Sequence, residues 1–272
     1  MVLHPNAKIN IGLNVVERRD DGYHNIETVF YPIGLTDVLE IQPSSTCSDY
    51  SFSSSGIEIG GDPEDNLIVK AYRLLQYEYA LPPVDISLCK QIPFGAGLGG
   101  GSSDAAFMIK GLNELFNLKI SKKKMEKFAS LLGADCPVFI KNKPVFATGI
   151  GNVFSPIKLS LKGYFLLLVK PDIHVSTPLA YSRVTPCPSE VSLVDCLKKP
   201  LNQWREYVKN DFEKSVFSQF PVVEQIKEQL YQIGALYASM SGSGSAVYGI
   251  FESLPADMSC FEDCFVVSGL LD

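Results

Sequence analysis

The sequence of 272 residues lacks the cysteine and histidine spacings of a metal site or a disulfide framework. Its seven cysteines are scattered and odd in number, and no two of them are separated by two residues. The three histidines lie near none of the cysteines at a zinc-like spacing. Cys260 and Cys264 are spaced to meet on one helix face, but we expect no metal there. We therefore expect reduced thiols and a cytoplasmic location.

Long apolar runs and basic stretches are also missing. Residues 164–169 form one of the longest apolar runs, which is far too short to cross a bilayer, and no signal or transit segment is recognisable at the N-terminus. The formal net charge is −6, and no basic stretch with interleaved aromatic residues occurs. We expect neither a membrane nor a nucleic acid as a partner, and local groups must hold any anionic ligand. The oligomeric state is not predicted.

The sequence has no internal repeat and no low-complexity linker, and its patterns mix strands with helices. Apolar alternation and short apolar runs predict strands at 7–16, 25–33, 38–43, 84–92, 136–140, 144–150, 164–169 and 264–268, and two strands around a Ser/Gly loop within 235–252. Helical spacing predicts helices over 65–79, after the glycines at 95–101, from Ser121 to Gly133, over 177–184 and over 221–234.

This order of elements favours an α+β fold of two layers. The Ser-rich segment 44–56 is expected to be an exposed loop or a polar edge strand. A domain boundary near residue 152 would separate residues 1–152 from residues 153–272.

Five glycines and two serines crowd the stretch PFGAGLGGGSSDAA, residues 93–106, between a strand pattern and a helix pattern. A tight loop needs only one or two glycines, so five indicate a ligand that approaches the backbone. Gly95, Gly97 and Gly100 fit the G-x-G-x-x-G of dinucleotide sites. That interpretation is weak, because the acidic residue expected about twenty positions later, at the end of a parallel strand, is missing.

A nucleotide triphosphate fits this stretch better. Consecutive bare N–H groups form an anion-binding concavity. Ser102 and Ser103 open the following helix, so its positive end faces the same point, and their hydroxyls could bond phosphate oxygens or Mg²⁺. Gly101 stands where a Walker loop has lysine. The missing positive charge must therefore come from elsewhere in the fold.

The glycine stretch resembles the phosphate-binding motif of the galactokinase, homoserine kinase, mevalonate kinase and phosphomevalonate kinase superfamily. Four more segments occur in order along nearly the whole chain, namely AKINIGLNVVERRDDGYHNIETVF, DNLIVKAYRLL, LGADCPVF and SMSGSGSAVYGIF. Together the five resemble the family that uses ATP to phosphorylate the 2-hydroxyl of 4-diphosphocytidyl-2-C-methyl-D-erythritol in non-mevalonate isoprenoid synthesis. Asn152 is a departure, since the family usually has Glu after ATGIG.

The resemblance implies a two-domain small-molecule kinase with mixed or antiparallel sheets and helices packed on them. It also implies ATP as the donor, and therefore Mg²⁺. The ATP-binding residues that it implies are Asn66, Pro93, Gly95, Gly97, Leu98, Gly99, Gly100, Gly101, Ser102 and Ser103. From the residues alone, Asn66 is equally well a helix N-cap. No acidic cluster for the metal stands out, so its ligands are not predicted beyond phosphates, waters and Ser102 or Ser103.

The resemblance assigns catalysis to Lys8 and Asp135. From the residues alone, a turn aspartate between Gly133 and Pro137 is favoured over a catalytic role for Asp135, and a solvated strand lysine is favoured for Lys8. The resemblance implies that Lys8 pairs with Asp135, keeps this proton acceptor ionised and stabilises charge on the transferred phosphoryl group. Asn10, on the same strand face as Lys8, would bond the substrate diol.

The cytidine would be held by Tyr23 and His24, which follow an Asp-Gly turn. The resemblance implies that Tyr23 stacks on the base and that His24 bonds its polar edge, whereas the residues alone make both of them exposed hairpin residues. Tyr181 matches a second stacking aromatic, with Thr177 nearby, and a core tyrosine is the equal alternative. The glycines of the SGSGS loop, among them Gly242, form either a plain hairpin loop or a close approach to the substrate phosphates.

Two other functions stay open. A superfamily kinase of the homoserine or mevalonate type is less consistent with the DGYH segment, because a small acyclic substrate needs no aromatic grip. A non-catalytic ATP-binding module is less consistent with the presence of both Lys8 and Asp135.

Overall fold

The computed structural model describes residues 1–45 and 49–271. Part of the Ser-rich segment, residues 46–48 with Cys47, lies outside the described residues. The chain forms two compact units, and each takes several separate segments. Unit 1 consists of Met1–Ala7, Leu35–Phe94 and Gly99–Lys143, and unit 2 of Lys8–Gly34, Gly95–Leu98 and Pro144–Asp272.

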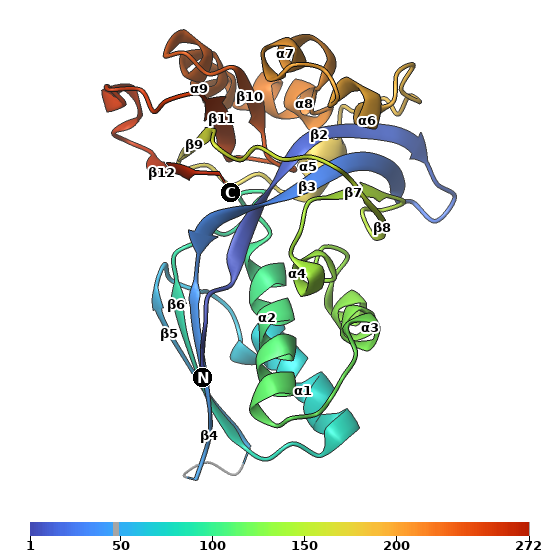
Figure 1. Cartoon of the computed structure of the whole chain (residues 1–272), viewed down its shortest axis with the longest axis vertical. Coiled ribbons are helices and arrows are strands. Elements are labelled where there is room, and N and C mark those ends of the chain that lie inside the picture. Colours follow the sequence, from blue (N-terminus) through green and yellow to red (C-terminus); the bar gives the residue numbers. More distant parts are fainter. Residues whose placement is uncertain (46–48, 272) are drawn as a thin grey trace. The chain divides into compact units, whose positions relative to one another are not determined.

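The described part of unit 1 contains a four-stranded sheet in the order β1-β4-β6-β5 (Figure 1). Its strands are β1 (Val2–Leu3), β4 (Val38–Pro43), β5 (Tyr50–Gly56) and β6 (Val84–Lys90). Strand β5 is a polar edge strand that runs parallel to β6, and the other neighbours are antiparallel. The helices are η1 (Pro63–Asp65), α1 (Leu67–Tyr79), α2 (Gly100–Leu115), α3 (Lys122–Leu132) and α4 (Val138–Lys141).

Helices α1 and α3 of unit 1 begin where the sequence places capping side chains. Asn66 Oδ1 accepts a hydrogen bond of 2.9 Å from the Ile68 N–H and caps α1. Ser121 caps α3 by accepting from the Lys124 N–H, and Gly133 ends that helix. Helices α1 and α2 pack side by side (Figure 1), and α2 also packs on β4. The predicted helices α1 and α3 and their capping residues, Asn66 and Ser121, are confirmed.

The predicted strand at 136–140 is wrong, because a turn over 133–137 leads there into helix α4. The N–H groups of Cys136 and Val138 bond the carbonyls of Gly133 and Asp135. Pro137 has the helical angles φ −63° and ψ −24°. A short apolar run such as VFI is compatible with a buried strand and with a buried helix, and packing of α4 on α2 decides for the helix.

The described part of unit 2 contains two four-stranded sheets, in the orders β2-β3-β7-β8 and β10-β11-β9-β12. Their strands are β2 (Asn6–Arg18), β3 (His24–Thr36), β7 (Val145–Thr148), β8 (Val153–Pro156), β9 (Phe165–Lys170), β10 (Tyr237–Met240), β11 (Val247–Phe251) and β12 (Phe265–Leu270). The helices are α5 (Thr177–Tyr181), α6 (Leu193–Cys196), η2 (Leu201–Gln203), α7 (Trp204–Tyr207), α8 (Phe212–Gln219), α9 (Pro221–Gln232) and η3 (Ser259–Phe261).

The sheet β10-β11-β9-β12 of unit 2 buries a strand that the sequence marks as apolar. Strand β9 lies between β11 and β12, and Leu166–Val169 are buried on both faces as predicted. Helix α9 packs on β10 and β11 (Figure 1) through Val223, Ile226 and Leu230. Each such buried side chain stabilises the fold by about 1.5–3 kcal/mol relative to an exposed one.

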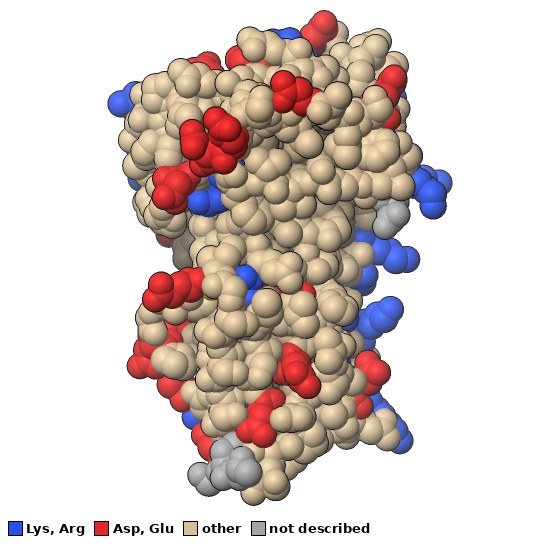
Figure 2. Space-filling view, turned by 90° about the vertical axis from the view of Figure 1, so that its left-hand side faces the viewer, with Lys and Arg blue, Asp and Glu red and all other residues tan. Residues whose placement is uncertain are grey.

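The predicted α+β class is confirmed, since mixed and antiparallel sheets carry packed helices in both units. No helix among the described residues is both long and apolar enough to cross a membrane. On the face that Figure 2 draws, Asp and Glu side chains are scattered, and wide areas between them carry no charge.

Candidate functional site

The glycine stretch joins β6 to α2, and its backbone conformation requires glycine. Gly95, Gly97 and Gly99 have φ angles of 57°, 75° and 70°, in the left-handed region that other residues rarely adopt. Gly99 is the N-cap of α2. Ser102 and Ser103 lie in the first turn of this helix, so the predicted position of the two hydroxyls at its N-terminus is confirmed.

Within unit 2, Gly97 lies against the Ser/Gly loop formed by residues 241–245. The Ser241 hydroxyl donates to the Gly97 carbonyl over 2.8 Å, and a Cβ atom at Gly97 would overlap the carbonyl oxygen of Ser241. The Ala246 N–H donates to the carbonyl of Ala96 over 3.3 Å. The absence of a side chain at Gly97 is thus required by a contact between two loops of the protein, which the sequence did not indicate.

Lys8 is not a solvated strand lysine. Its side chain lies on β2 with only 3% of the residue exposed. The ammonium donates to Asn10 Oδ1 over 2.6 Å and to the Gly97 carbonyl over 2.9 Å, and it lies 5.0 Å from the centre of the Phe30 ring. A buried ammonium is costly unless it is hydrogen-bonded, so this position is specifically built. The structure therefore brings Lys8, Asn10 and the glycine loop together.

Asn10 is held in one orientation. Its Nδ2 donates to Thr28 Oγ1 over 3.0 Å, and the Thr28 hydroxyl donates to the Gly12 carbonyl over 2.5 Å. Its backbone N–H donates to Ser241 Oγ over 3.1 Å. Thr28 was missed by the sequence analysis, because nothing local in β3 marks it as a partner of β2.

Asp135 lies half-buried in the turn between α3 and α4, in unit 1. The thiol of its neighbour Cys136 is buried, and burial raises the pKa of this thiol to about 11 although the Ser102 hydroxyl bonds it. This contact brings the turn next to the first turn of α2. Lys8 belongs to unit 2. The predicted pairing of Lys8 with Asp135 stays a prediction.

A buried ion cluster that the sequence analysis missed lies beside the first turn of α2. Lys90, at the end of β6, pairs with Asp37 and, over 3.0 Å, with Asp104, and all three residues are at most 3% exposed. A Cβ atom at Gly100 would lie 2.9 Å from Lys90 Nζ. Burial raises the pKa of Asp104, Lys90 opposes this shift, and the Asp37 carboxylate adds to it.

A cavity of about 430 Å³ opens in unit 1 between the end of η1 and the start of α2. It is lined by Phe94, Gly101 and Asp104 from the glycine stretch and by Asn66 and Leu67 from the start of α1. Asn66 therefore caps α1 and also lines this cavity, and its predicted contact with ATP stays a prediction.

The predicted cytidine residues all belong to unit 2. The ring of His24 stacks on that of Tyr181, with ring centres 4.6 Å apart and an angle of 19° between the planes. The predicted stacking of Tyr23 on a base stays a prediction. Tyr181 also meets Phe212 edge-on at 4.6 Å, so it is part of the core as well as of this stack. Tyr23 is 62% exposed, and Thr177 begins α5.

Some sequence features take no part in these contacts. Asn152 is exposed in the turn between β7 and β8. The six cysteines in the described part of the chain are free thiols. No group of three or more His, Cys, Asp or Glu side chains among the described residues is arranged to hold a metal ion.

Comparison with known proteins agrees with this fold. The model of the N-terminal domain of GHMP kinases matches residues 66–143, and that of the C-terminal domain of GHMP kinases matches residues 192–257. Mevalonate kinase from Methanococcus jannaschii has the same fold, with a TM-score of 0.72, 14% identity and coverage of 100% of this chain and 98% of that one. The fold and these matches define a small-molecule kinase of the GHMP class.

Closer relatives specify the family. A 4-diphosphocytidyl-2-C-methyl-D-erythritol kinase from Bacteroides fragilis is 59% identical over 92% of both chains, and one from Parabacteroides distasonis is 55% identical over 100% of both. The crystal structure of a 4-(cytidine 5'-diphospho)-2C-methyl-D-erythritol kinase has a TM-score of 0.84 at 30% identity, and 98% of each chain is covered. The chain belongs to the 4-diphosphocytidyl-2-C-methyl-D-erythritol kinase family.

Proposed function

We propose that this chain transfers the γ-phosphoryl group of ATP to the 2-hydroxyl of 4-diphosphocytidyl-2-C-methyl-D-erythritol, a step in non-mevalonate isoprenoid synthesis. The observation that carries the proposal is the position of Lys8, whose buried ammonium is held between Asn10 and the carbonyl of Gly97. Family membership supports it, because the relatives carry the name of this kinase over the whole chain.

Phosphoryl transfer to a hydroxyl needs positioning, charge neutralisation and a proton acceptor. In our proposal, Lys8 provides positive charge beside the glycine loop and stabilises charge that develops on the transferred group. Asp135 accepts the proton of the 2-hydroxyl, and Lys8 keeps the carboxyl ionised. Asn10, with its amide fixed by Thr28, orients the substrate diol.

ATP would bind along the glycine stretch and in the cavity of unit 1. The N–H groups at the start of α2 face an anion favourably, because the helix dipole is positive there. Asn66, Leu67 and Phe94 line the cavity, which at about 430 Å³ has a size usual for small-molecule sites. The proposed ATP-binding residues are those that the resemblance implies, namely Asn66, Pro93, Gly95, Gly97, Leu98, Gly99, Gly100, Gly101, Ser102 and Ser103.

The residues around the start of α2 fit Mg²⁺, which prefers hard oxygen ligands and keeps several waters. Ser102 offers a half-exposed hydroxyl there, and Ser103 Oγ and Asp104 Oδ1 are buried without a hydrogen-bond partner. We propose that Ser102 or Ser103 holds the ion together with ATP oxygens and water. When bound, Mg²⁺ neutralises phosphate charge, and the position of the nucleotide still depends on the protein groups described above.

For the cytidine, we propose that Tyr23 stacks on the base and that His24 bonds its polar edge. Tyr181 would form the second stacking surface, with Thr177 nearby, and Gly242 would let the backbone approach the substrate phosphates. The exposed ring of Tyr23 and the proximity of His24 to Tyr181 support this arrangement. Stacking of this kind contributes about 1–3 kcal/mol per base.

We also propose a cytoplasmic location and the two domains 1–152 and 153–272. The free thiols of the described cysteines are consistent with a reducing compartment. The N-terminal GHMP match falls within residues 1–152 and the C-terminal match within 153–272.

An ADP-release assay with the cytidyl substrate, mevalonate and homoserine tests the function. We expect turnover with the cytidyl substrate only, and turnover with either of the others would contradict the proposal. Asp135→Asn should keep ATP binding and lower kcat by about 10²–10⁴-fold. Asp195→Asn is the matched control, because Asp195 is exposed and pairs only at the surface with Lys198. Wild-type turnover in Asp135→Asn would remove Asp135 from the mechanism.

A further inference from the structure

The segment Asn210-Asp211-Phe212-Glu213, at the start of α8, has three polar side chains that all bind backbone groups of unit 2. Asn210 and Glu213 are only 3% and 8% exposed. Asp211 accepts a hydrogen bond of 2.7 Å from the Val15 N–H of β2. Buried polar side chains are retained where every hydrogen bond is made, so their partners indicate what they hold in place.

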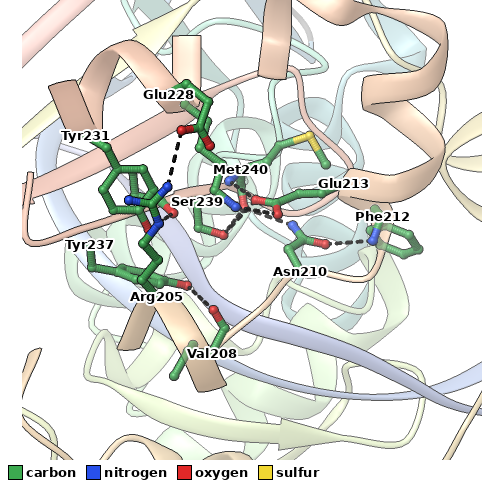
Figure 3. Close-up of polar contacts among 12 residues, drawn as sticks. Arg205, Val208, Asn210, Phe212, Glu213, Glu228, Tyr231, Tyr237, Ser239 and Met240 are labelled. Atoms are coloured by element: carbon green, nitrogen blue, oxygen red, sulfur yellow. Dashed lines mark hydrogen bonds and ion pairs between the residues drawn. The ribbon is translucent and has the colours of Figure 1, made fainter. Parts of the chain in front are cut away.

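Asn210 holds the Ser/Gly loop by hydrogen bonds to its backbone and to that of the preceding residue. Its Nδ2 donates to the carbonyls of Met240 and Gly242, each over 2.8 Å, and its Oδ1 accepts from the Phe212 N–H over 3.0 Å. Both amide hydrogens and the amide oxygen are used, so the side chain has one orientation (Figure 3). Asn210 thereby fixes the carbonyls on either side of Ser241.

Glu213 holds the strand that leads into this loop. One carboxylate oxygen accepts from the Met240 N–H over 2.9 Å and from the Ser239 hydroxyl over 3.2 Å, as Figure 3 shows. The other oxygen pairs with Lys227 Nζ over 2.6 Å. Both backbone groups of Met240 are therefore held, its N–H by Glu213 and its carbonyl by Asn210. Such charge-assisted bonds are stronger than bonds between neutral groups.

The loop that these two residues hold contacts the proposed active site directly. Ser241 bonds the carbonyl of Gly97 and the N–H of Asn10. A Cβ atom at Gly242 would lie 3.2 Å from Gly97 Cα and 3.3 Å from Asn10 Oδ1. The Gly97 carbonyl and Asn10 Oδ1 both accept hydrogen bonds from the Lys8 ammonium. A shift of the loop must therefore displace the groups that hold Lys8.

We infer that Asn210 and Glu213 are positioning residues for phosphoryl transfer, which act by locking the Ser/Gly loop against Gly97 and Asn10. The inference rests on the proposed function, since it assigns Lys8 a role in transfer. Misplacement of a reacting group by about 1 Å costs up to about 10²-fold in rate. Asn210→Ala should accordingly lower kcat by about 10–100-fold and leave the dissociation constant of ATP within about twofold.

A matched control separates this effect from a general loss of stability. Tyr237→Phe removes a buried hydroxyl from the same region. This hydroxyl donates to the Val208 carbonyl over 3.2 Å and also meets the hydroxyls of Ser239 and Tyr248, and none of these partners belongs to the loop of residues 241–245 (Figure 3). We expect it to lower Tm like Asn210→Ala but to keep kcat within about twofold, with both corrected for the folded fraction. Equal losses of kcat in the two variants, or wild-type kcat in Asn210→Ala, would overturn the inference.

The pair Glu213→Gln and Glu213→Ala keeps the test decisive if Asn210→Ala does not fold. Glutamine retains an acceptor for the Met240 N–H, so Glu213→Gln should keep kcat within about threefold, whereas Glu213→Ala should lose about tenfold. Equal kcat in the two variants contradicts the inference.

Amide hydrogen exchange then distinguishes the inference from the proposed function. Residues 95–98 and 241–245 should exchange faster in Glu213→Ala than in Tyr237→Phe, and equal rates would refute the locking of the loop. If the wild-type protein shows no turnover with the cytidyl substrate, the proposed function fails, and the exchange rates still decide whether the loop is held as inferred.

Discussion

Replacement of Lys8 by methionine tests the centre of the proposed mechanism. Methionine keeps most of the side-chain volume but removes the ammonium that bonds Asn10 and the Gly97 carbonyl. Loss of one preorganised donor to developing charge lowers kcat by about 10²–10³-fold, or about 2.7–4 kcal/mol. We expect this loss in kcat for Lys8→Met, because the side chain lies in the position from which the proposal has it act.

The stability of this variant should change much less than its activity. Each lost hydrogen bond to a charged group destabilises the fold by about 1.5–3 kcal/mol, whereas removal of a buried ammonium relieves a desolvation penalty of several kcal/mol. The two effects oppose each other, and we expect a net change within about 2 kcal/mol. For a chain of this size, that is at most about 4–8 °C in Tm.

The assay measures ADP release at saturating ATP and cytidyl substrate, with Tm measured on the same samples. Lys110→Met is a suitable control, since Lys110 is a partly buried lysine on α2 that lies over the Phe107 ring. It should keep kcat within about twofold. If Lys8→Met retained more than a tenth of wild-type kcat, Lys8 would not stabilise the transferred group, and the reasoning from its position would be refuted.

Three further predictions follow from the geometry. Tyr23→Ala should raise KM for the cytidyl substrate by about 5–150-fold and leave KM for ATP unchanged, and an unchanged KM for the cytidyl substrate would favour a substrate without a base. Burial raises the pKa of Asp104 to about 7, above its value of 3.8 in the unfolded chain, so this group adds stability as pH falls from 8 toward 5. Asp104→Asn should reduce that rise in Tm, and an unaltered dependence of Tm on pH contradicts the shift. Gly97→Ala should cost at least about 1–2 kcal/mol and lower kcat, because a Cβ atom there is strained and overlaps Ser241, and equal Tm values would contradict the loop contact.

Much of the fold could be predicted from local sequence patterns. Asn66 and Ser121 are N-caps whose side chains can be identified from the sequence, and the continuous apolar run of β9 favoured a strand buried on both faces. The strand prediction for residues 136–140 was wrong because a run of four or five apolar residues fits the period of a strand and that of a helix. Only the packing of α4 on α2 distinguishes the two.

The residues of the site also differ in how far the sequence identifies them: local patterns mark some of them, whereas others depend on partners that are distant in the sequence. Lys90 lies two residues beyond Leu88 on the inward face of β6, so alternation alone marks it as a buried lysine that needs a carboxylate. Nothing in the sequence selects Asp37, which lies 53 positions away, as that partner. Asn210 and Glu213 are harder still, since their partners are mostly backbone groups of Met240 and Gly242, which have no sequence signature. A residue that binds another residue's backbone is therefore found only when the fold is known, and this is why Asn210 and Glu213, unlike Lys8, Asn10 and Gly97, had to come from the structure.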